Sequence, residues 1–266
     1  LKELIKDRTK DFQASFMITH FFNPPRYMRL LEVVKGPNTD SEKYELIKKF
    51  ADIHLGKSVV DCHDTPGFIG NRIGVFWLQL AVIEAIQQGI KVEEVDALFS
   101  KPMGIPKTGV FGLIDLVGLD LMPLIGKNLR DNLPSEDAYC HLEQDTPVIK
   151  KMIEEGYTGR KGKGGFYRVN RDTGEKIKEV IDLKTGIYSK ADKIKLSALE
   201  NTHTLKDLLS YPDQYGKYTW SVLSQLLSYV ASHASEIAND IVGIDTAMKL
   251  GYGWKYGPFE LGCKKT

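Results

Sequence analysis

The fold is decided by residues 20–36, which read His20-Phe-Phe-Asn-Pro-Pro-Arg-Tyr-Met-Arg-Leu-Leu-Glu32-Val-Val-Lys-Gly36. Residues 14–22 alternate between apolar and polar side chains, and residues 29–35 are again apolar and prone to form a strand. Between them, residues 23–25 (Asn-Pro-Pro) cannot continue a paired strand, because proline has no N–H to donate to a neighbouring strand. The stretch therefore predicts two strands joined by a turn.

An antiparallel pair folded about Arg26 would place His20 directly opposite Glu32. Opposed side chains on one face have Cβ atoms roughly 4.5–5.5 Å apart. At that distance the carboxylate can accept the imidazole N–H, fix its tautomer and favour its charged form. An oriented histidine beside a carboxylate is the working part of many acid–base sites. The alternative is a structural histidine, and a register slip of two residues would move Glu32 to a diagonal position.

Length and charge exclude several classes of protein. The 266 residues suffice for one large or two modest domains with hydrophobic cores. The formal net charge is +1 and the basic residues are scattered among acids, so no nucleic-acid partner is expected. The longest apolar stretch, residues 73–86, is interrupted by Gln79 and Glu84. No membrane span is expected, because a span needs about 20 apolar residues.

The cysteines indicate the compartment. Cys62, Cys140 and Cys263 are widely spaced, odd in number and free of any Cys-x-x-Cys pattern. This argues against a disulfide framework and against a zinc site, so no metal is predicted. We expect a reducing compartment and a cytoplasmic location.

Residues 64–72, Asp-Thr-Pro-Gly-Phe-Ile-Gly-Asn-Arg, predict the start of a long helix. Thr65 would be the N-cap and Pro66 the first helical residue. The glycines would leave one side of the helix bare, so that another backbone or a ligand can approach closely. The amide of Asn71, in the second turn, is then either a helix-packing contact or a hydrogen-bond partner of a substrate oxygen, and spacing alone favours packing.

The loop at residues 159–167, Gly-Arg-Lys-Gly-Lys-Gly-Gly-Phe-Tyr, has four glycines and three cations. Such a loop can cradle a phosphate. It is not a Walker loop, because no Gly-Lys-Ser/Thr closes it. The preferred reading is a solvated turn into a strand. Residues 165–188 then predict a small meander with turns at residues 172–174 and 184–186.

The chain also contains an internal repeat. Asp96 is followed by glycines and then by Phe111, and Asp245 is followed by glycines and then by Phe259. Each copy follows a long apolar helix. The repeat predicts that Asp96 and Asp245 occupy matching places, as do Phe111 and Phe259.

Two of these motifs resemble those of the L-3-hydroxyacyl-CoA dehydrogenase family. The first is His20-Phe-Phe-Asn-Pro-Pro with Met28, Leu30 and Glu32, and the second is the stretch at residues 64–72. The resemblance implies an oxidoreductase that oxidises 3-hydroxyacyl-CoA to 3-ketoacyl-CoA with NAD in fatty-acid β-oxidation. It also implies residue roles. His20 would be the general base, Glu32 its orienting carboxylate, and Asn71 a substrate contact; Asn23 would contact the nicotinamide end of NAD, and Lys161 would reach the bound NAD.

The resemblance further implies a mainly α fold. We expect two tandem helical bundles of the dehydrogenase C-terminal type, preceded by a truncated Rossmann-type α/β remnant. The expected boundaries are residues 1–63 for the remnant of the NAD-binding domain, 64–170 for the first helical domain, and 171–266 for the meander linker with the second repeat. The helices around 66–120 should pack on those around 218–262 about an approximate two-fold axis, as an intrachain pseudo-dimer. The two-copy arrangement is most similar to fused enzymes that carry an enoyl-CoA hydratase module.

One expected feature is missing from the sequence. No Gly-x-Gly-x-x-Gly follows a strand, and in this family that loop binds the NAD pyrophosphate at a helix N-terminus. We expect the loop upstream of Leu1, and expect this chain alone to be inactive and to bind NAD weakly. Two alternatives are a non-catalytic helical interaction or dimerisation module, and another β-hydroxyacid dehydrogenase. The pair His20 and Glu32 argues against the latter, since that class usually relies on a lysine.

Overall fold

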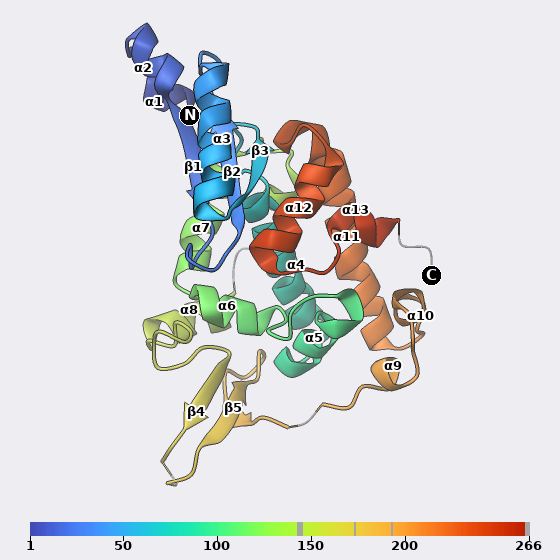
Figure 1. Ribbon diagram of the computed structural model, residues 1–266. Coiled ribbons are helices and arrows are strands. Elements are labelled where there is room, and N and C mark those ends of the chain that lie inside the picture. Colours follow the sequence, from blue (N-terminus) through green and yellow to red (C-terminus); the bar gives the residue numbers. More distant parts are fainter. Residues whose placement is uncertain (143–145, 173, 193, 264–266) are drawn as a thin grey trace. The chain divides into compact units, whose positions relative to one another are not determined.

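The computed structural model describes residues 1–142, 146–172, 174–192 and 194–263 (Figure 1). The chain divides into two compact units. Of the described residues, the first contains Leu1–Gly74 together with residues 227–263, and the second contains Val75–Leu226. Two long helices, α4 (Gly70–Gln88) and α11 (Gln214–Ile237), have one end in each unit.

The first unit is built on a three-stranded sheet with the order β1-β2-β3. Its strands are β1 (Met17–Phe21), β2 (Leu30–Lys35) and β3 (Ser58–Cys62). β1 runs antiparallel to β2, and His20 pairs with Glu32, so the predicted register is confirmed. β2 runs parallel to β3. Such a pair needs a crossover connection, which α3 (Ser41–Leu55) provides.

The central strand β2 is buried on both faces. Leu31 and Val33 pack with Tyr44 and Ala51 of α3. Leu30 points to the opposite face, because side chains alternate along a strand, and there it lies against Gly251 of α12 (Ile241–Tyr252). This double cover explains why the strand reads as a continuous apolar run interrupted only by Glu32.

Local sequence signals set the bounds of α3. The carboxylate of Asp40 accepts hydrogen bonds from the backbone N–H groups of Glu42 and Lys43, as an N-cap residue should. Gly56 ends the helix at φ 62°, in the left-handed region that favours glycine. The other helices of this unit are α1 (Lys2–Ile5), α2 (Lys10–Ser15) and α13 (Pro258–Gly262).

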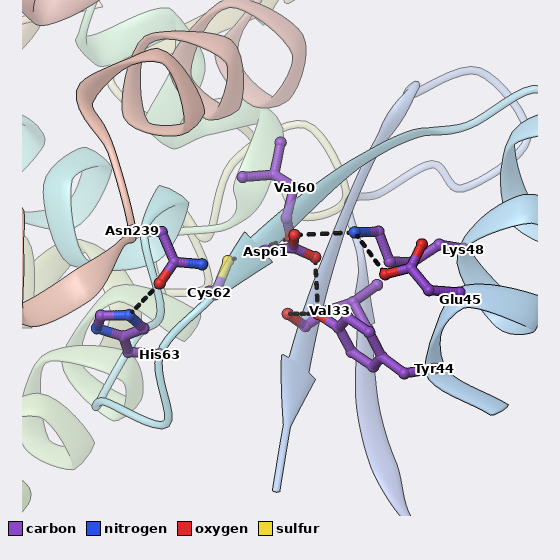
Figure 2. A network of polar contacts seen from close by, with 9 residues as sticks. All are labelled: Val33, Tyr44, Glu45, Lys48, Val60, Asp61, Cys62, His63 and Asn239. Carbon is purple, nitrogen blue, oxygen red and sulfur yellow. Dashed lines mark hydrogen bonds and ion pairs between the residues drawn. The ribbon is translucent and has the colours of Figure 1, made fainter. Parts of the chain in front are cut away.

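A polar network joins α3 to β3 (Figure 2). Asp61 accepts a hydrogen bond from the Tyr44 hydroxyl at 2.7 Å and one from the Lys48 ammonium at 2.9 Å. Just beyond β3, the two ring nitrogens of His63 lie 2.9 Å from the carbonyl of Glu236 and 2.8 Å from Oδ1 of Asn239. The C-terminal end of β3 is thereby fixed before the chain enters the turn that leads to α4.

The second unit combines short helices with a separate sheet. Its antiparallel meander has the order β4-β5-β6 and consists of β4 (Tyr167–Asn170), β5 (Ile177–Ile181) and β6 (Tyr188–Lys190). The predicted meander is confirmed. Its turn at 184–186 is present, with Gly186 at φ 71°, whereas the turn at 172–174 includes residue 173, which lies outside the described residues.

The helices of the second unit enclose an aromatic core, in which the ring of Phe99 contacts those of Trp77 and Tyr218. The helical segments are α5 (Val92–Leu98), η1 (Lys101–Met103), α6 (Phe111–Val117), α7 (Leu121–Asn132), η2 (Ala138–His141), α8 (Pro147–Glu154), α9 (Ser197–Glu200) and α10 (Leu205–Leu209).

The internal repeat has the same local geometry in both copies. Asp96 accepts the N–H groups of Phe111 and Gly112 at 2.7 and 3.1 Å, in the first turn of α6. Asp245 accepts those of Phe259 and Glu260 at 2.8 and 3.1 Å, in the first turn of α13. The prediction that the two aspartates and the two phenylalanines match is confirmed. In both copies a carboxylate satisfies amides that a helix N-terminus leaves unpaired.

The expectation of two tandem helical bundles is wrong. Within the first unit α12 packs on β2 and β3 rather than completing a bundle of its own, and each unit contains a three-stranded sheet. The physical reason is the apolar second face of β2 and β3, which needs a cover that α12 supplies. Gly251 allows this helix to approach Leu30 and Phe22 closely, where a Cβ atom would collide. The expected domain boundaries stay a prediction.

The described helices include none with the length and apolar character that crossing a bilayer requires.

Candidate active site

The site is built on the pair of His20 and Glu32. Nδ1 of the imidazole lies 2.6 Å from Oε2 of the carboxylate. Glu32 has no exposed surface, whereas the His20 side chain is 30% exposed. When the carboxylate is ionised, Nδ1–H donates to it and Nε2 keeps its lone pair. The buried carboxylate of Glu32 therefore orients the imidazole, while part of the ring remains accessible to solvent.

The second oxygen of Glu32 is held by the segment that starts α4. Oε1 accepts the backbone N–H of Ile69 at 3.0 Å and that of Gly70 at 2.7 Å. A helix N-terminus is a favourable place for a carboxylate, since its unpaired amides and the helix dipole both stabilise negative charge. Both oxygens of Glu32 are thus fixed, and the orientation of His20 depends on the start of α4.

The start of α4 differs from the sequence expectation. The helix begins at Gly70, and residues 66–69 form a turn before it. Gly67 and Phe68 have φ angles of 79° and 48°, which a helix cannot contain. The prediction of Thr65 as N-cap and Pro66 as the first helical residue is therefore wrong. A bulky residue with positive φ is uncommon, and it stores backbone strain of order 1–3 kcal/mol.

Phenylalanine rings flank the imidazole. The ring of Phe22 lies edge-on at a centroid distance of 5.1 Å, and the ring of Phe68 is tilted at 5.7 Å. The unusual backbone of Phe68 thus accompanies a ring placed against His20. Gly70 permits this packing, because a Cβ atom there would collide with the Phe22 ring. The bare side predicted for the helix is used for aromatic packing.

The C-terminal part of the chain adds another aromatic ring to this packing. The ring of Tyr252, at the end of α12, contacts Phe22 at a centroid distance of 6.0 Å. Its hydroxyl lies where a Cβ of Gly74 would be. Burial, and after it the charge of Glu32, raises the pKa of Tyr252 well above its usual value. The same two causes raise the pKa of the Cys62 thiol. Both groups therefore stay neutral beside the carboxylate.

Asn71 follows directly on the turn that binds Glu32. It is half-buried in the first turn of α4, and its side-chain amide makes no hydrogen bond to any described residue. The structure therefore brings His20, Glu32 and Asn71 into one unit around the start of one helix. The amide is available as a hydrogen-bond donor, but the contact with a substrate stays a prediction.

Asn23 lies in the turn between β1 and β2 and is exposed. Its side chain likewise makes no hydrogen bond within the described chain. The turn itself is held by Lys57, whose ammonium donates to the carbonyl oxygen of Pro25 and to that of Met28, the latter at 2.7 Å. Lys57 is only 6% exposed, which is unusual for a lysine. Sequence reasoning missed it; the one available signal was a cation directly after the helix-ending Gly56.

Arg72 was also missed as a structural residue. Its side chain is fully buried. Nε donates to the hydroxyl of Tyr229 at 2.5 Å. One terminal nitrogen donates to the carbonyl of Pro66 and the other to a carboxylate oxygen of Glu236, each at 3.5 Å. It therefore links the turn before α4 to α11 within the first unit. The partners lie far away in sequence, so no local pattern could identify them.

Lys161 is exposed and belongs to the second unit, where it lies in the loop before β4. No hydrogen bond or ion pair holds its ammonium group within the described residues. Its contact with NAD stays a prediction. No cluster of three or more His, Cys, Asp or Glu side chains suited to a metal ion occurs among the described residues.

The geometry supports acid–base chemistry. A half-exposed imidazole with a free Nε2 can take a proton from a hydroxyl group. The positive charge that results lies 2.6 Å from a buried carboxylate, which stabilises it. A neighbouring amide can donate to an oxygen on the same molecule. These parts suit a reaction in which a hydroxyl loses its proton as a carbonyl forms.

Comparison with known families gives two matches that together cover most of the chain. Residues 1–65 match the NAD binding domain of 3-hydroxyacyl-CoA dehydrogenase, and residues 67–169 match its C-terminal domain. The start of the chain is thus a Rossmann-like α/β domain followed by a helical domain. This, too, contradicts the expected pair of helical bundles after a remnant.

Curated relatives extend the comparison. A fatty acid oxidation complex trifunctional enzyme of Rickettsia felis is 44% identical over 261 residues, covering 98% of this chain and 36% of the relative. A 3-hydroxyacyl-CoA dehydrogenase of Bacillus subtilis is 37% identical over 268 residues, covering 98% of this chain and 33% of the relative. The chain spans about a third of the length of these relatives.

Among solved structures, 3-hydroxybutyryl-CoA dehydrogenase from Escherichia coli K12 has a TM-score of 0.63 and 22% identity, covering 92% of this chain and 62% of that one. At this identity the likeness concerns the fold.

Proposed function

The chain belongs to the 3-hydroxyacyl-CoA dehydrogenase family, and we propose that the protein containing it oxidises a 3-hydroxyacyl-CoA to the 3-ketoacyl-CoA with NAD. The observation that carries the proposal is the contact of 2.6 Å between Nδ1 of His20 and the buried Glu32. It orients an accessible imidazole as a general base, and the reaction needs one because the hydroxyl proton must leave as the C3–H bond is broken.

His20 takes the hydroxyl proton at Nε2. Glu32 keeps Nδ1 protonated before the transfer and stabilises the imidazolium after it. Phe22 and Phe68 restrict the imidazole to one orientation, so that little freedom is lost on reaching the reactive geometry. Asn71 donates its amide to the reacting oxygen or to the thioester carbonyl of the substrate.

NAD supplies the hydride acceptor when it is bound. The chain's own chemistry fits this group, because Asn23 presents an unpaired amide with both a donor and an acceptor. An amide of this kind suits the carboxamide at the nicotinamide end. Lys161 would add a cation for the same cofactor. Asn23 and Lys161 are therefore proposed as cofactor contacts.

The relatives' names support a wider context. The Rickettsia felis relative is named as a trifunctional enzyme of fatty acid oxidation, and the chain covers only a third of it. We accordingly place the reaction in fatty-acid β-oxidation and propose a fused enoyl-CoA hydratase module in the whole protein. Hydration of an enoyl-CoA by that protein tests this point independently of the dehydrogenase. A cytoplasmic location is also proposed; it is supported only by the free cysteines.

Pairing of the two repeats within the chain is a further proposal. Contacts between α4 and α11 support it. In the first unit Arg72, near the start of α4, donates to Tyr229 in the second half of α11. In the second unit Tyr218, near the start of α11, donates at 2.8 Å to the carbonyl of Ala81 in the second half of α4. Two helices related by a two-fold axis would make such reciprocal contacts. Superposition of the two copies in a crystal structure tests the symmetry.

The dehydrogenase proposal is tested with the whole protein. The reduction of acetoacetyl-CoA by NADH is followed from the loss of NADH absorbance. Turnover by the wild type that disappears in His20→Ala supports the proposal. No turnover by a folded wild-type protein would contradict it and would favour a non-catalytic interaction module.

A further inference from the structure

The last turn of α12 touches the aromatic ring that flanks the imidazole of His20. Tyr252, the final residue of this helix, places its ring edge-on against Phe22 at a centroid distance of 6.0 Å and an interplanar angle of 71°. Phe22 in turn lies edge-on to His20 at 5.1 Å and 63°. A row of aromatic rings therefore runs from the second copy of the repeat to the proposed base.

Two glycines of α4 make room for this row of rings. Gly70 and Gly74 are four residues apart, so they lie on the same face of the helix in successive turns. A Cβ atom on Gly70 would collide with the Phe22 ring, and one on Gly74 would collide with the hydroxyl end of Tyr252. The two rings therefore pack directly on the helix backbone, and neither can move closer to it.

A third glycine, in α12 itself, also contacts Phe22. A Cβ atom on Gly251 would lie 2.8 Å from the Leu30 side chain and 3.0 Å from the Phe22 ring. The Phe22 ring is thus bounded by the backbones of two helices and by the rings of Tyr252 and His20. A ring packed this closely has few alternative positions. Removal of the Tyr252 ring would open space beside it.

The two copies of the repeat differ at this position. Gly104 and Gly253 each follow the aspartate of their copy by eight residues, and both have left-handed angles, with φ 69° and 68°. The residue before the glycine is Met103 in the first copy and Tyr252 in the second. A methionine side chain is flexible, whereas a tyrosine ring is rigid and fixed by two torsion angles. The second copy therefore has a rigid side chain where it meets the site.

We propose that Tyr252 is a positioning residue of the dehydrogenase site, whose ring holds Phe22 against the imidazole of His20. A base held in one orientation loses little freedom on reaching the reactive geometry. The kinetic consequence rests on the proposed function, whereas the packing does not. The hydroxyl takes no part as an acid or base, because burial, and after it the charge of Glu32, raises the pKa of Tyr252 well above its usual value.

NMR of the 266-residue chain with isotope-labelled histidine tests the packing. The ring current of Phe22 shifts the ring-proton resonances of His20, and a His20→Gln variant assigns them. Tyr252→Met introduces the residue of the first copy and should move these resonances toward those of an unflanked histidine. Tyr252→Phe keeps the ring and should leave them unchanged. His54, whose ring lies 5.2 Å from that of Phe50 on α3, is the internal reference and should stay the same in every variant.

A second variant disturbs the same contact without a change of any aromatic residue. Gly74→Ala adds a Cβ where the hydroxyl end of Tyr252 lies, so it should displace the ring and change the His20 resonances as Tyr252→Met does. Leu261→Ala is the control, because Leu261 is only 6% exposed in α13 and its truncation should lower stability without a change in the row of rings. Circular dichroism checks that each variant is folded.

The kinetic consequence is tested in the whole protein with acetoacetyl-CoA and NADH. Tyr252→Met should lower kcat by roughly 10-fold to 10²-fold with little change in either KM, because the base is misplaced while binding is kept. Tyr252→Phe should retain the wild-type rate. An inactive wild-type protein would contradict the proposed function alone, since the NMR comparison still decides whether Tyr252 positions His20.

Three results would overturn the proposal. The first is a set of His20 resonances that Tyr252→Met and Gly74→Ala leave unchanged. The second is an equal change in Leu261→Ala, because the effect would then reflect a general loosening of the fold. The third is a Tyr252→Phe variant that behaves as Tyr252→Met does, because the hydroxyl rather than the ring would then be responsible.

Discussion

Glu32 accepts the backbone N–H of Gly70 at 2.7 Å while its other oxygen contacts His20 at 2.6 Å. One buried carboxylate therefore joins the sheet to the start of α4. The proposed base is oriented by the same segment that carries Asn71, so a displacement of the helix start would disturb both residues. Substitutions at His20, at Glu32 and at Gly70 therefore test the base, its carboxylate partner and the packing around them one at a time.

Replacement of His20 by alanine should remove the general base. In the whole protein we expect the rate constant of hydride transfer to fall by roughly 10²–10⁴-fold, with little change in NAD affinity. Single-turnover kinetics and NAD titration measure the two quantities. His54→Ala is the matched control, because His54 is exposed on α3. A His20 variant that keeps more than half of the wild-type rate would rule out the proposed role.

Replacement of Glu32 by glutamine keeps the volume of the side chain and removes its charge. The amide can still accept one N–H from the turn before α4, but it no longer stabilises an imidazolium. We expect a large loss of rate with near-normal substrate binding, seen as a lower kcat at similar KM. A variant with normal kcat would show that the charge of Glu32 is not used.

Gly70→Ala tests the packing around the imidazole. The added Cβ would collide with the Phe22 ring, which must move away from His20. Overpacking of this kind costs about 1–3 kcal/mol, so the denaturation midpoint and the activity should both fall. Gly262→Ala is the control, since its Cβ would make only an ordinary contact with Leu227 at 3.8 Å. Equal behaviour of the two variants would contradict the packing argument.

Lys57→Met should loosen the turn that carries Asn23. The carbonyl oxygens of Pro25 and Met28 would lose their buried donor, at a cost of about 1–3 kcal/mol. Because the turn holds the proposed nicotinamide contact, we expect a higher KM for NADH with a smaller effect on the KM for the acyl-CoA. Lys49→Met, an exposed position on α3, is the control. Parallel changes in both KM values would indicate a general loss of structure instead.

Asp96 should make stability depend on pH. Burial raises its pKa from 3.8 to about 7, so the folded state binds more protons than the unfolded state between these values. Stability from this group is therefore greatest below pH 4 and decreases as the pH rises to 7, by at most about 1.4 kcal/mol per pH unit. Asp96→Asn should flatten this dependence. Thermal unfolding of both proteins from pH 4 to pH 8 measures it.

Asp245→Asn is the internal control for that experiment. It has the matching pair of amides, and burial also raises its pKa, but it lies in the first unit and lacks the tyrosine hydroxyl that binds Asp96. We expect Asp245→Asn to change the dependence of stability on pH less than Asp96→Asn does. If Asp96→Asn leaves the pH dependence of the wild type unaltered, the burial argument fails.

The parts of the site that could be predicted from sequence are those set by local patterns. Alternation about the Asn-Pro-Pro turn was enough to pair His20 with Glu32. Repeat spacing was enough to match Asp96 with Asp245. In each case the interaction joins residues whose separation is fixed by a turn or a helix.

The parts that could not be predicted depend on distant segments or on unusual backbone angles. Nothing near Phe22 indicates that Tyr252 contacts it, and nothing in the second repeat indicates that α12 covers β2. Because Phe68 has a positive φ angle, α4 begins only at Gly70. Proline is usually common in the first turn of a helix, and for that reason the sequence predicted a helix start at Pro66. The predicted fold class was wrong for the same reason, because α12 covers β2 and β3 instead of completing a second helical bundle.

The position of Tyr252 has a consequence for biosynthesis. Within this region the ribosome makes His20 and Glu32 early, but the helix that covers Leu30 and supports Phe22 emerges more than two hundred residues later, when nearly all of the 266 residues are made. Until then the apolar second face of β2 lacks its native cover, and nascent chains in this state are exposed to aggregation. The contact of Phe22 with Tyr252, beside the proposed base, can therefore form only after the nascent polypeptide has been made as far as α12.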